Sequence, residues 1–162
     1  MTTGTTHTVF YGYQGTSTLV LRVDFGYTAP NFQIRAGLVN TASTWTNTSW
    51  YTITKATHYI EFDWRAAANG GLTLWIDGVQ KANLTGVNNS NRLVDMVRLG
   101  PVAGITNGTR GVEYFDAFSS HRRSYIGGFH SQGHVLADLV ALASAVPTPT
   151  PTLSATGANT VP

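Results

Sequence analysis

The chain has 162 residues, which is enough for one domain with a substantial core. Only 11% of the residues are charged, the formal net charge is +2, and cysteine is absent. This composition excludes disulfides and thiolate zinc sites, and it argues against a nucleic-acid partner, which needs concentrated Lys and Arg. No apolar run approaches the ~20 residues that span a bilayer, so we expect no membrane insertion.

Strand patterns follow one another closely along most of the chain, and clusters of Gly, Asn, Pro, Ser and Thr with turn chemistry separate them. Regular short strands of this kind predict an all-β, antiparallel β-sandwich or barrel. The expected strands are Thr8–Tyr13, Thr18–Phe25, Phe32–Val39, Trp50–Thr54, His58–Trp64, Leu72–Asp77, Gln80–Leu84, Leu93–Gly100 and Val112–Ser119, with a further short piece at Arg123–Ile126.

The clearest pattern lies between residues 58 and 78, where two alternating strands are joined by a turn of small residues. Alternation with a period of two places one set of side chains on a buried face. The second strand ends at Asp77-Gly78, a dipeptide that suits a tight hairpin turn because both residues tolerate positive φ. The predicted core positions are Ile60, Phe62, Trp64, Leu72, Leu74 and Ile76.

The composition changes after residue 127. His134–Ala145 has helix formers and apolar residues spaced three and four apart, so residues 128–146 are predicted to be a connector with a short helix. Pro147–Pro162 alternates Pro with Thr and has neither charge nor aromatic residues, which predicts an extended linker toward further modules of a larger parent chain.

Several short motifs occur in one order along the chain. They are Val9–Tyr13 (VFYGY), Leu19–Phe25, Thr57–Trp64 (THYIEFDW), Leu74–Val79 (LWIDGV), Val97–Gly100 (VRLG) and Tyr114–Phe118 (YFDAF). In combination they resemble the concanavalin A-like lectin/glucanase domain, the laminin-G-like jelly roll of large secreted or surface proteins of bacteria. The resemblance implies a jelly-roll sandwich over residues 1–127.

The resemblance also implies that this domain is incomplete at its N-terminus. Domains of that family begin with strands that pair beside the closing Phe-Asp-Ala-Phe strand, and here Met1 falls directly before a core strand. We therefore expect an unpaired strand edge and exposed apolar side chains near Tyr114–Phe118.

Polar and aromatic residues on three strands, and at the two ends of the polar loop Thr46–Ser49, are the candidates for ligand binding. Arg22 and Arg35 occupy non-core positions of consecutive strands, with Asp24 and Gln33 beside them. If the strands are neighbours, these side chains form a polar patch, either a ligand site or a ladder of ion pairs. Trp rings can stack on sugars or anchor loops to a core. The ligand-binding candidates are Arg22, Arg35, Trp45, Trp50 and Trp75.

The candidate for catalysis is the pair Glu61 and Asp63, whose carboxylates share one face of a strand. Retaining glycosidases need two carboxyl groups ~5–5.5 Å apart. Retaining glucanases of the resembled fold carry a third acid in this motif, and Trp64, Arg65 and Ala66 stand there instead. We therefore expect no enzyme activity, with a glycosidase as the alternative.

Metal binding has only weak candidates. The resembled lectin and laminin-G domains often hold calcium through Asp, Asn and carbonyl oxygens, which singles out Asp77, Asn88 and Asp95. No spacing matches a defined calcium loop, so no cofactor is expected, with calcium as the alternative.

The function that follows is an expectation from the fold resemblance. It is a non-catalytic extracellular or cell-surface module that binds a glycan or a cell-surface protein. The alternatives are a fragment of a glycoside hydrolase and a structural spacer. The first residues lack the apolar segment of a signal peptide, so export is expected as part of a larger secreted protein.

Overall fold

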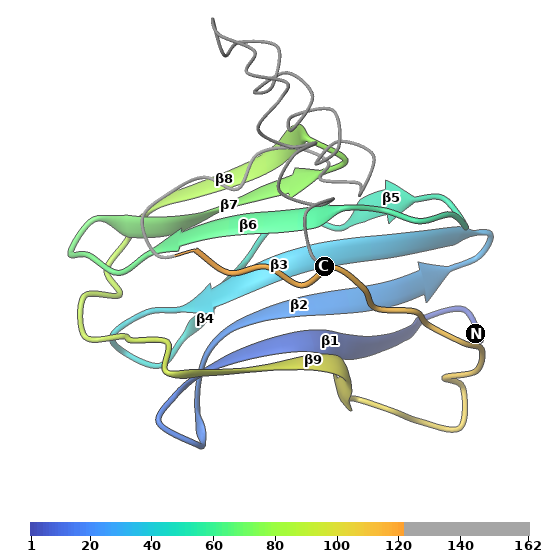
Figure 1. Cartoon of the computed structure of the whole chain (residues 1–162), viewed down its shortest axis with the longest axis horizontal. Coiled ribbons are helices and arrows are strands. Elements are labelled where there is room, and N and C mark those ends of the chain that lie inside the picture. The colour runs from blue at the N-terminus through green and yellow to red at the C-terminus, as the bar shows by residue number, and fades with distance from the viewer. Residues whose placement is uncertain (122–162) are drawn as a thin grey trace, which may run out of the picture. The chain divides into compact units, whose positions relative to one another are not determined.

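The structure, a computed structural model, describes residues 1–121, which form two antiparallel β-sheets and contain no helix (Figure 1). Consequently, no helix in this part of the chain is long and apolar enough to cross a membrane. The strands are β1 (Thr5–Gln14), β2 (Thr18–Thr28), β3 (Asn31–Val39), β4 (Trp45–Asn47), β5 (Tyr51–Ile53), β6 (Ile60–Arg65), β7 (Gly70–Ile76), β8 (Val79–Val87) and β9 (Met96–Ala103).

The larger sheet has six strands in the order β4-β3-β2-β1-β9, and β5 pairs with the same edge of β3 as β4 does. Its strands β1 to β3 are successive hairpins, whereas β9 returns from the far end of the described chain to pair with β1. The polar turn residues between the hydrophobic runs allow these reversals, as at Gly15, which has a φ of 61°.

The smaller sheet is the meander β6-β7-β8. Its β7–β8 hairpin closes at the predicted dipeptide, where Asp77 and Gly78 have φ values of 53° and 75° and Ile76 pairs with Val79. Both central residues therefore adopt the positive φ that a two-residue turn of the favoured twist requires.

The two sheets pack face to face and bury a single cluster of apolar side chains, which makes the described chain a β-sandwich. Most of these side chains alternate with outward-facing ones, and the adjacent pairs Val9-Phe10 and Val20-Leu21 lie at irregularities of the β1–β2 register. The buried cluster consists of Val9, Phe10, Val20, Leu21, Val23, Ile34, Ala36, Leu38, Leu72, Leu74 and Ile76.

A buried arginine fastens the β8–β9 connection to the β3–β4 turn. Arg92 donates to the carbonyl oxygen of Asn40 from both Nε (3.1 Å) and Nη2 (2.8 Å), and Nη2 also donates to Ser43 Oγ (2.9 Å). The side chain thus satisfies carbonyl and hydroxyl oxygens that a tight turn leaves without strand partners. This contact ties the segment between the two sheets to the larger one.

The predicted core face of β6 and β7 is confirmed, although the two strands differ in burial. Leu72, Leu74 and Ile76 are buried, whereas Ile60, Phe62 and Trp64 are partly buried and pack against the same cluster. The difference arises because β7 lies between two strands, while β6 pairs with β7 alone among the described residues.

Two predicted features of the chain are wrong. Val112–Ser119 forms no strand, because among residues 1–121 no neighbouring strand pairs with it, although the exposure of apolar side chains expected near Tyr114–Phe118 is found. Thr46 and Asn47, predicted to lie in the polar loop Thr46–Ser49, belong to the short strand β4, because the edge of β3 offers them backbone partners. The pieces expected at Arg123–Ile126, His134–Ala145 and Pro147–Pro162 lie outside the described residues.

Candidate ligand-binding face

The outer face of the six-stranded sheet brings together most of the predicted ligand-binding residues. Leu21 and Val23 of β2 point into the core, so Arg22 and Asp24 point outward. In the β2–β3 register Asp24 pairs with Arg35, and Gly26 pairs with Gln33. The polar side chains expected to form a patch therefore lie on one face, provided by two adjacent strands.

A buried carboxylate organises this face. Asp24 accepts a hydrogen bond from Thr8 Oγ1 at Oδ1 (2.8 Å) and one from Arg35 Nε at Oδ2 (2.9 Å). Arg22 Nε lies 3.2 Å from the same Oδ2, and Arg22 Nη2 donates to Asn47 Oδ1 (3.1 Å). One carboxylate thus fixes two guanidinium groups, which limits the orientations open to both.

Each of these arginines lies over a tryptophan ring. The guanidinium carbon of Arg22 is 4.3 Å from the ring centroid of Trp45, and that of Arg35 is 4.5 Å from the ring centroid of Trp50. Gly26 leaves the space for the second ring, because a Cβ at this position would be 3.1 Å from two carbons of Trp50. Both rings are half-buried and held by cation–π contacts at the edge of the sheet.

A third arginine–aromatic pair on this face was missed by sequence reasoning. Arg98 of β9 lies over Tyr13 of β1 at 5.2 Å, and the Tyr11 and Tyr13 rings are 5.6 Å apart. The alternation of Tyr11 and Tyr13 was visible in the sequence. The pairing of Arg98 with Tyr11 was not, because it joins strands from opposite ends of the described chain. We call Arg22, Arg35, Arg98, Trp45, Trp50 and Tyr13 the arginine–aromatic face.

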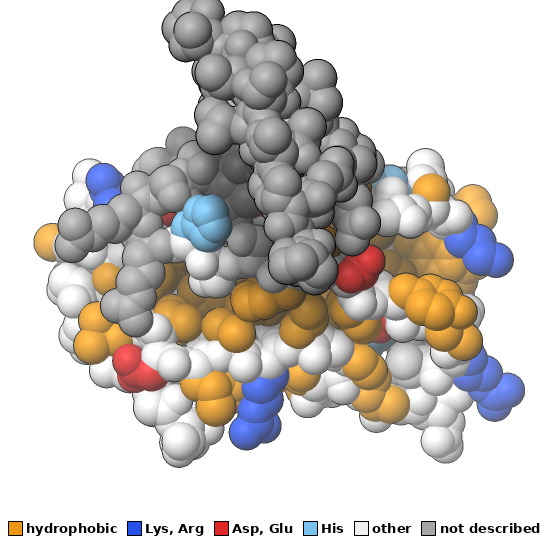
Figure 2. Space-filling view, viewed as in Figure 1, with side chains coloured by type: hydrophobic (Ala, Val, Ile, Leu, Met, Phe, Trp, Pro, Cys, Tyr) orange, Lys and Arg blue, Asp and Glu red, His pale blue; other side chains and the backbone are white. Residues whose placement is uncertain are grey.

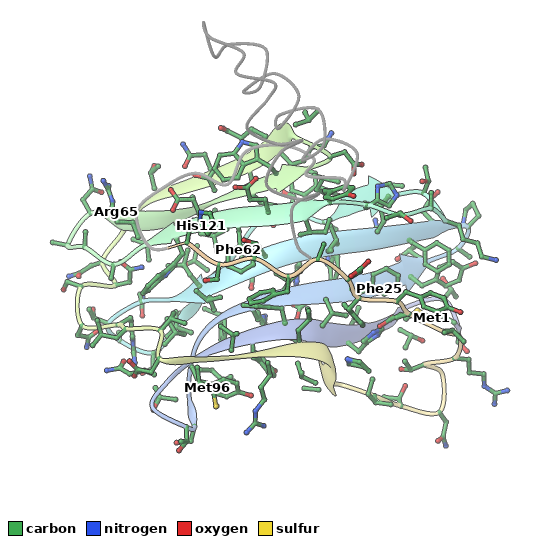
Figure 3. The ribbon with its side chains drawn as sticks, in the orientation of Figure 1. Met1, Phe25, Phe62, Arg65, Met96 and His121 are labelled. Carbon is green, nitrogen blue, oxygen red and sulfur yellow. The ribbon has the colours of Figure 1, made fainter. Side chains whose placement is uncertain are left out.

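The remaining candidates for ligand binding and catalysis lie on the other sheet. Trp75 pairs with Glu61 across β6 and β7, and Asp63 pairs with Thr73, so all of these face outward from the smaller sheet. A shallow hollow of about 130 Å³ beside them is lined by Asp63, Arg65, Thr73 and Asn83 among others. Trp75 therefore lies on the smaller sheet, whereas Trp45 and Trp50 lie against the arginines of the larger sheet. Phe62 and Arg65, labelled in Figure 3, belong to β6 of the smaller sheet.

The three candidate metal ligands, Asp77, Asn88 and Asp95, each make hydrogen bonds with a different partner. Asp95 Oδ2 accepts from the Gly15 amide (2.7 Å), and Asn88 Oδ1 accepts from Ser90 Oγ (3.0 Å). Asp77 Oδ1 accepts from the Tyr59 amide (2.9 Å). Within residues 1–121 no three His, Asp or Glu side chains gather where they could hold a metal ion.

Asp77 also belongs to a hydrogen-bonded chain with His58 and Thr54. Its Oδ2 is 2.7 Å from His58 Nδ1, and His58 Nε2 is 2.9 Å from Thr54 Oγ1. The Thr54 amide also donates to Nε2 (3.1 Å), so the imidazole fastens the turn before β6. Partial burial raises the pKa of Asp77, but the Tyr59 hydrogen bond and the contact with His58 outweigh it and hold that pKa below its ordinary value.

Comparisons with known proteins find no matching protein family, no matching curated protein and no matching solved structure. The resemblance to concanavalin A-like domains therefore stays a hypothesis from the sequence motifs.

Proposed function

We propose that this chain is a non-catalytic recognition module of an extracellular or cell-surface protein, with a concanavalin A-like jelly-roll fold, and that it binds a glycan through the arginine–aromatic face. The low charge and the Thr-, Ser- and Asn-rich surface support an extracellular setting. The proposed ligand site consists of side chains of β1 to β4 and β9, together with Trp50, which directly precedes β5.

The observation that supports this proposal is the fixed arrangement of Trp45 and Trp50 on an outward sheet face. Sugar rings offer apolar C–H faces that stack on aromatic rings, and hydroxyl groups that accept hydrogen bonds from N–H donors. Arg35 donates Nε to Asp24, and its guanidinium lies over Trp50, so the described residues 1–121 take no hydrogen bond from its terminal nitrogens. Prearranged rings and donors of this kind lose little conformational entropy on binding.

The test is a binding screen of the purified full chain against a panel of immobilised polysaccharides, followed by titration with the best ligand. Trp45→Ala and Trp50→Ala should each weaken binding by about tenfold or more, since buried aromatic contacts commonly dominate recognition. Trp75→Ala is the matched control, and it should leave the affinity unchanged. Equal loss with all three variants would contradict a site on the larger sheet.

Two alternatives give different results in the same experiment. Glu61 and Asp63 share one face beside the hollow of the smaller sheet, which is the observation that favours a glycosidase fragment. Hydrolysis of a β-glucan that Glu61→Gln abolishes would establish that alternative. A chain that binds neither glycans nor cell-surface proteins would be a structural spacer, with no role for the arginine–aromatic face in recognition.

A further inference from the structure

The pairing of the strands places two arginines in one row across the outer face of the larger sheet. Arg98 of β9 pairs with Tyr11 of β1, and Tyr11 pairs on its other side with Arg22 of β2. The backbones of Arg98 and Arg22 are therefore two strand spacings apart, which is roughly 10 Å. Arg35 of β3 lies in the next outward-facing row, opposite Asp24 of β2. Three guanidinium groups thus gather on one face of a chain that contains few charged residues.

The positive charge on this face exceeds the negative charge. Asp24 is the carboxylate that pairs with these arginines among residues 1–121, and its Oδ2 contacts both Arg22 Nε (3.2 Å) and Arg35 Nε (2.9 Å). Asp95, which directly precedes β9, accepts from the Gly15 amide and forms no ion pair within the same residues. One carboxylate therefore offsets the charge of three guanidinium groups.

The other acidic residues of the described chain lie elsewhere. They are Glu61, Asp63 and Asp77 on or beside the smaller sheet, and Glu113 and Asp116 in the stretch after β9. Glu113 contacts the buried His7. On the side of the molecule drawn in Figure 2, hydrophobic side chains predominate, and Lys and Arg side chains lie apart from one another. The excess of positive charge is thus a feature of the arginine–aromatic face.

The same guanidinium groups keep hydrogen-bond donors for a ligand. Arg35 donates only Nε to the described residues, and Arg98 donates no hydrogen bond to them while it lies over Tyr13. A carboxylate fits the planar fork of an arginine with two parallel hydrogen bonds and also offsets its charge. A neutral hydroxyl group accepts a single weaker bond and leaves that charge uncompensated.

We infer that the glycan bound by the arginine–aromatic face is acidic, a polymer whose sugars carry carboxylate groups as uronic acids do. The inference rests on the glycan binding proposed above and names the class of sugar. One carboxylate lies beside Arg22 and Arg35, and a second lies at Arg98. Because roughly 10 Å separates these two positions, they need two acid groups of one chain. A sugar with a single acid group leaves one position empty.

Two other kinds of acidic polymer fit this face less well. An acidic peptide supplies carboxylates, but it lacks the apolar C–H faces of sugar rings that stack on Trp45 and Trp50. A nucleic acid requires a longer run of Lys and Arg along its phosphates than three arginines provide, and the chain as a whole has a formal net charge of only +2. The combination of rings and a few arginines favours a polyuronate.

The test titrates the full chain with soluble oligomers of galacturonate, glucuronate and mannuronate by isothermal titration calorimetry. Each oligomer is compared with its methyl ester, which has the same sugars and linkages without the charge. At least one acid form should bind about tenfold more tightly than its ester, because charge-assisted hydrogen bonds are about twice as strong as neutral ones. Added salt should weaken binding of the acid form and leave that of the ester nearly constant.

Charge removal locates the preference on this face. Arg98→Gln should lower the ratio of acid to ester affinity by about threefold or more. Lys81→Gln on β8 of the smaller sheet removes the same charge from the chain, so it is the matched control and should leave the ratio unchanged. Equal effects of the two substitutions would assign the preference to net charge alone and overturn the inference.

The remaining outcomes separate this inference from the proposed function. If acid and ester forms bind equally, or if only neutral glycans bind, and Trp45→Ala still weakens binding, the glycan site stands and the acidic specificity is overturned. If a sulfated dextran or a single-stranded DNA binds more tightly than every uronate, the carboxylate assignment is overturned. If no glycan binds, acidic or neutral, the proposed function is overturned together with this inference.

Discussion

Removal of the Asp24 carboxylate tests whether the arginine–aromatic face is built as described. In Asp24→Ala, Thr8 loses its hydrogen-bond acceptor, and both Arg22 and Arg35 lose their shared counterion. The carboxylate is 7% exposed, while the two arginine side chains are 21% and 27% exposed. The substitution therefore leaves two partly buried positive charges near each other without their only anionic neighbour in the described chain.

The expected loss of unfolding free energy is about 2–4 kcal/mol. Deleting one partner of a buried ion pair costs roughly 3–5 kcal/mol, because the other charge stays desolvated. Solvent reaches about a quarter of each arginine, which reduces that cost, whereas the loss of the Thr8 hydrogen bond adds to it. Asp24→Asn should lose less, since an amide oxygen can still accept from Thr8.

The assay is urea unfolding of the full chain, followed by tryptophan fluorescence and by far-ultraviolet circular dichroism. Asp63→Ala on the other sheet is the matched control, and it should change stability by about 0.5 kcal/mol or less, as exposed substitutions commonly do. A loss below about 1 kcal/mol for Asp24→Ala, with an unchanged slope against urea, would refute the idea that this carboxylate anchors the face.

Three further substitutions test the core, the strand contacts and the turn. Leu74→Ala should lower the unfolding free energy by about 2–5 kcal/mol in urea, since Leu74 is fully buried between the sheets; a loss under 1 kcal/mol would contradict this core. Gly71→Ala should prevent a stable fold, judged by circular dichroism, because its Cβ would collide with the carbonyl oxygen of Leu84; a wild-type midpoint would contradict the close approach of β7 and β8. The folded pKa of Asp77 lies below its ordinary value, chiefly through the hydrogen bond from the Tyr59 amide and then through the contact with His58, so the unfolded chain binds more protons and this stability is lost as the pH falls through the folded pKa. Asp77→Asn should flatten this part of the stability–pH curve, and an unchanged curve would show that the contact is not the cause.

The strands with strict alternation could be predicted from the sequence because their pairing depends on residues that are close together in the chain. The β6–β7–β8 meander is determined by the period-two pattern and by the Asp77-Gly78 turn, and both appear in the structure. The pairing of Asp24 with Arg35 also follows from a short hairpin between consecutive strands. In each case the partners are close in sequence, so pattern and turn chemistry suffice.

The elements that could not be predicted depend on which backbone lies beside them and not on their own composition. Val112–Ser119 has the composition of a strand, but a strand forms only where another backbone offers hydrogen bonds, and residues 1–121 provide none for it. Trp45–Asn47 has the composition of a loop, and the free edge of β3 makes it a strand. The Arg98–Tyr13 pair could not be predicted either, because β1 and β9 are far apart in sequence and become neighbours only in the folded sheet.

The connectivity of the larger sheet has a consequence for the order in which the domain folds and opens. The strands β1 to β3 and β6 to β8 are joined by short turns, so each meander needs little loop closure. The strand β9 can join only after the chain between Gln14 and Met96 has closed. We therefore expect β9 to dock late, so that a destabilising substitution there accelerates unfolding, while one in the β7–β8 hairpin slows folding. In native-state hydrogen exchange the amides of β9 should therefore exchange through an opening of lower free energy than those of β2. Unfolding of this sandwich should then begin with the separation of β9 from β1.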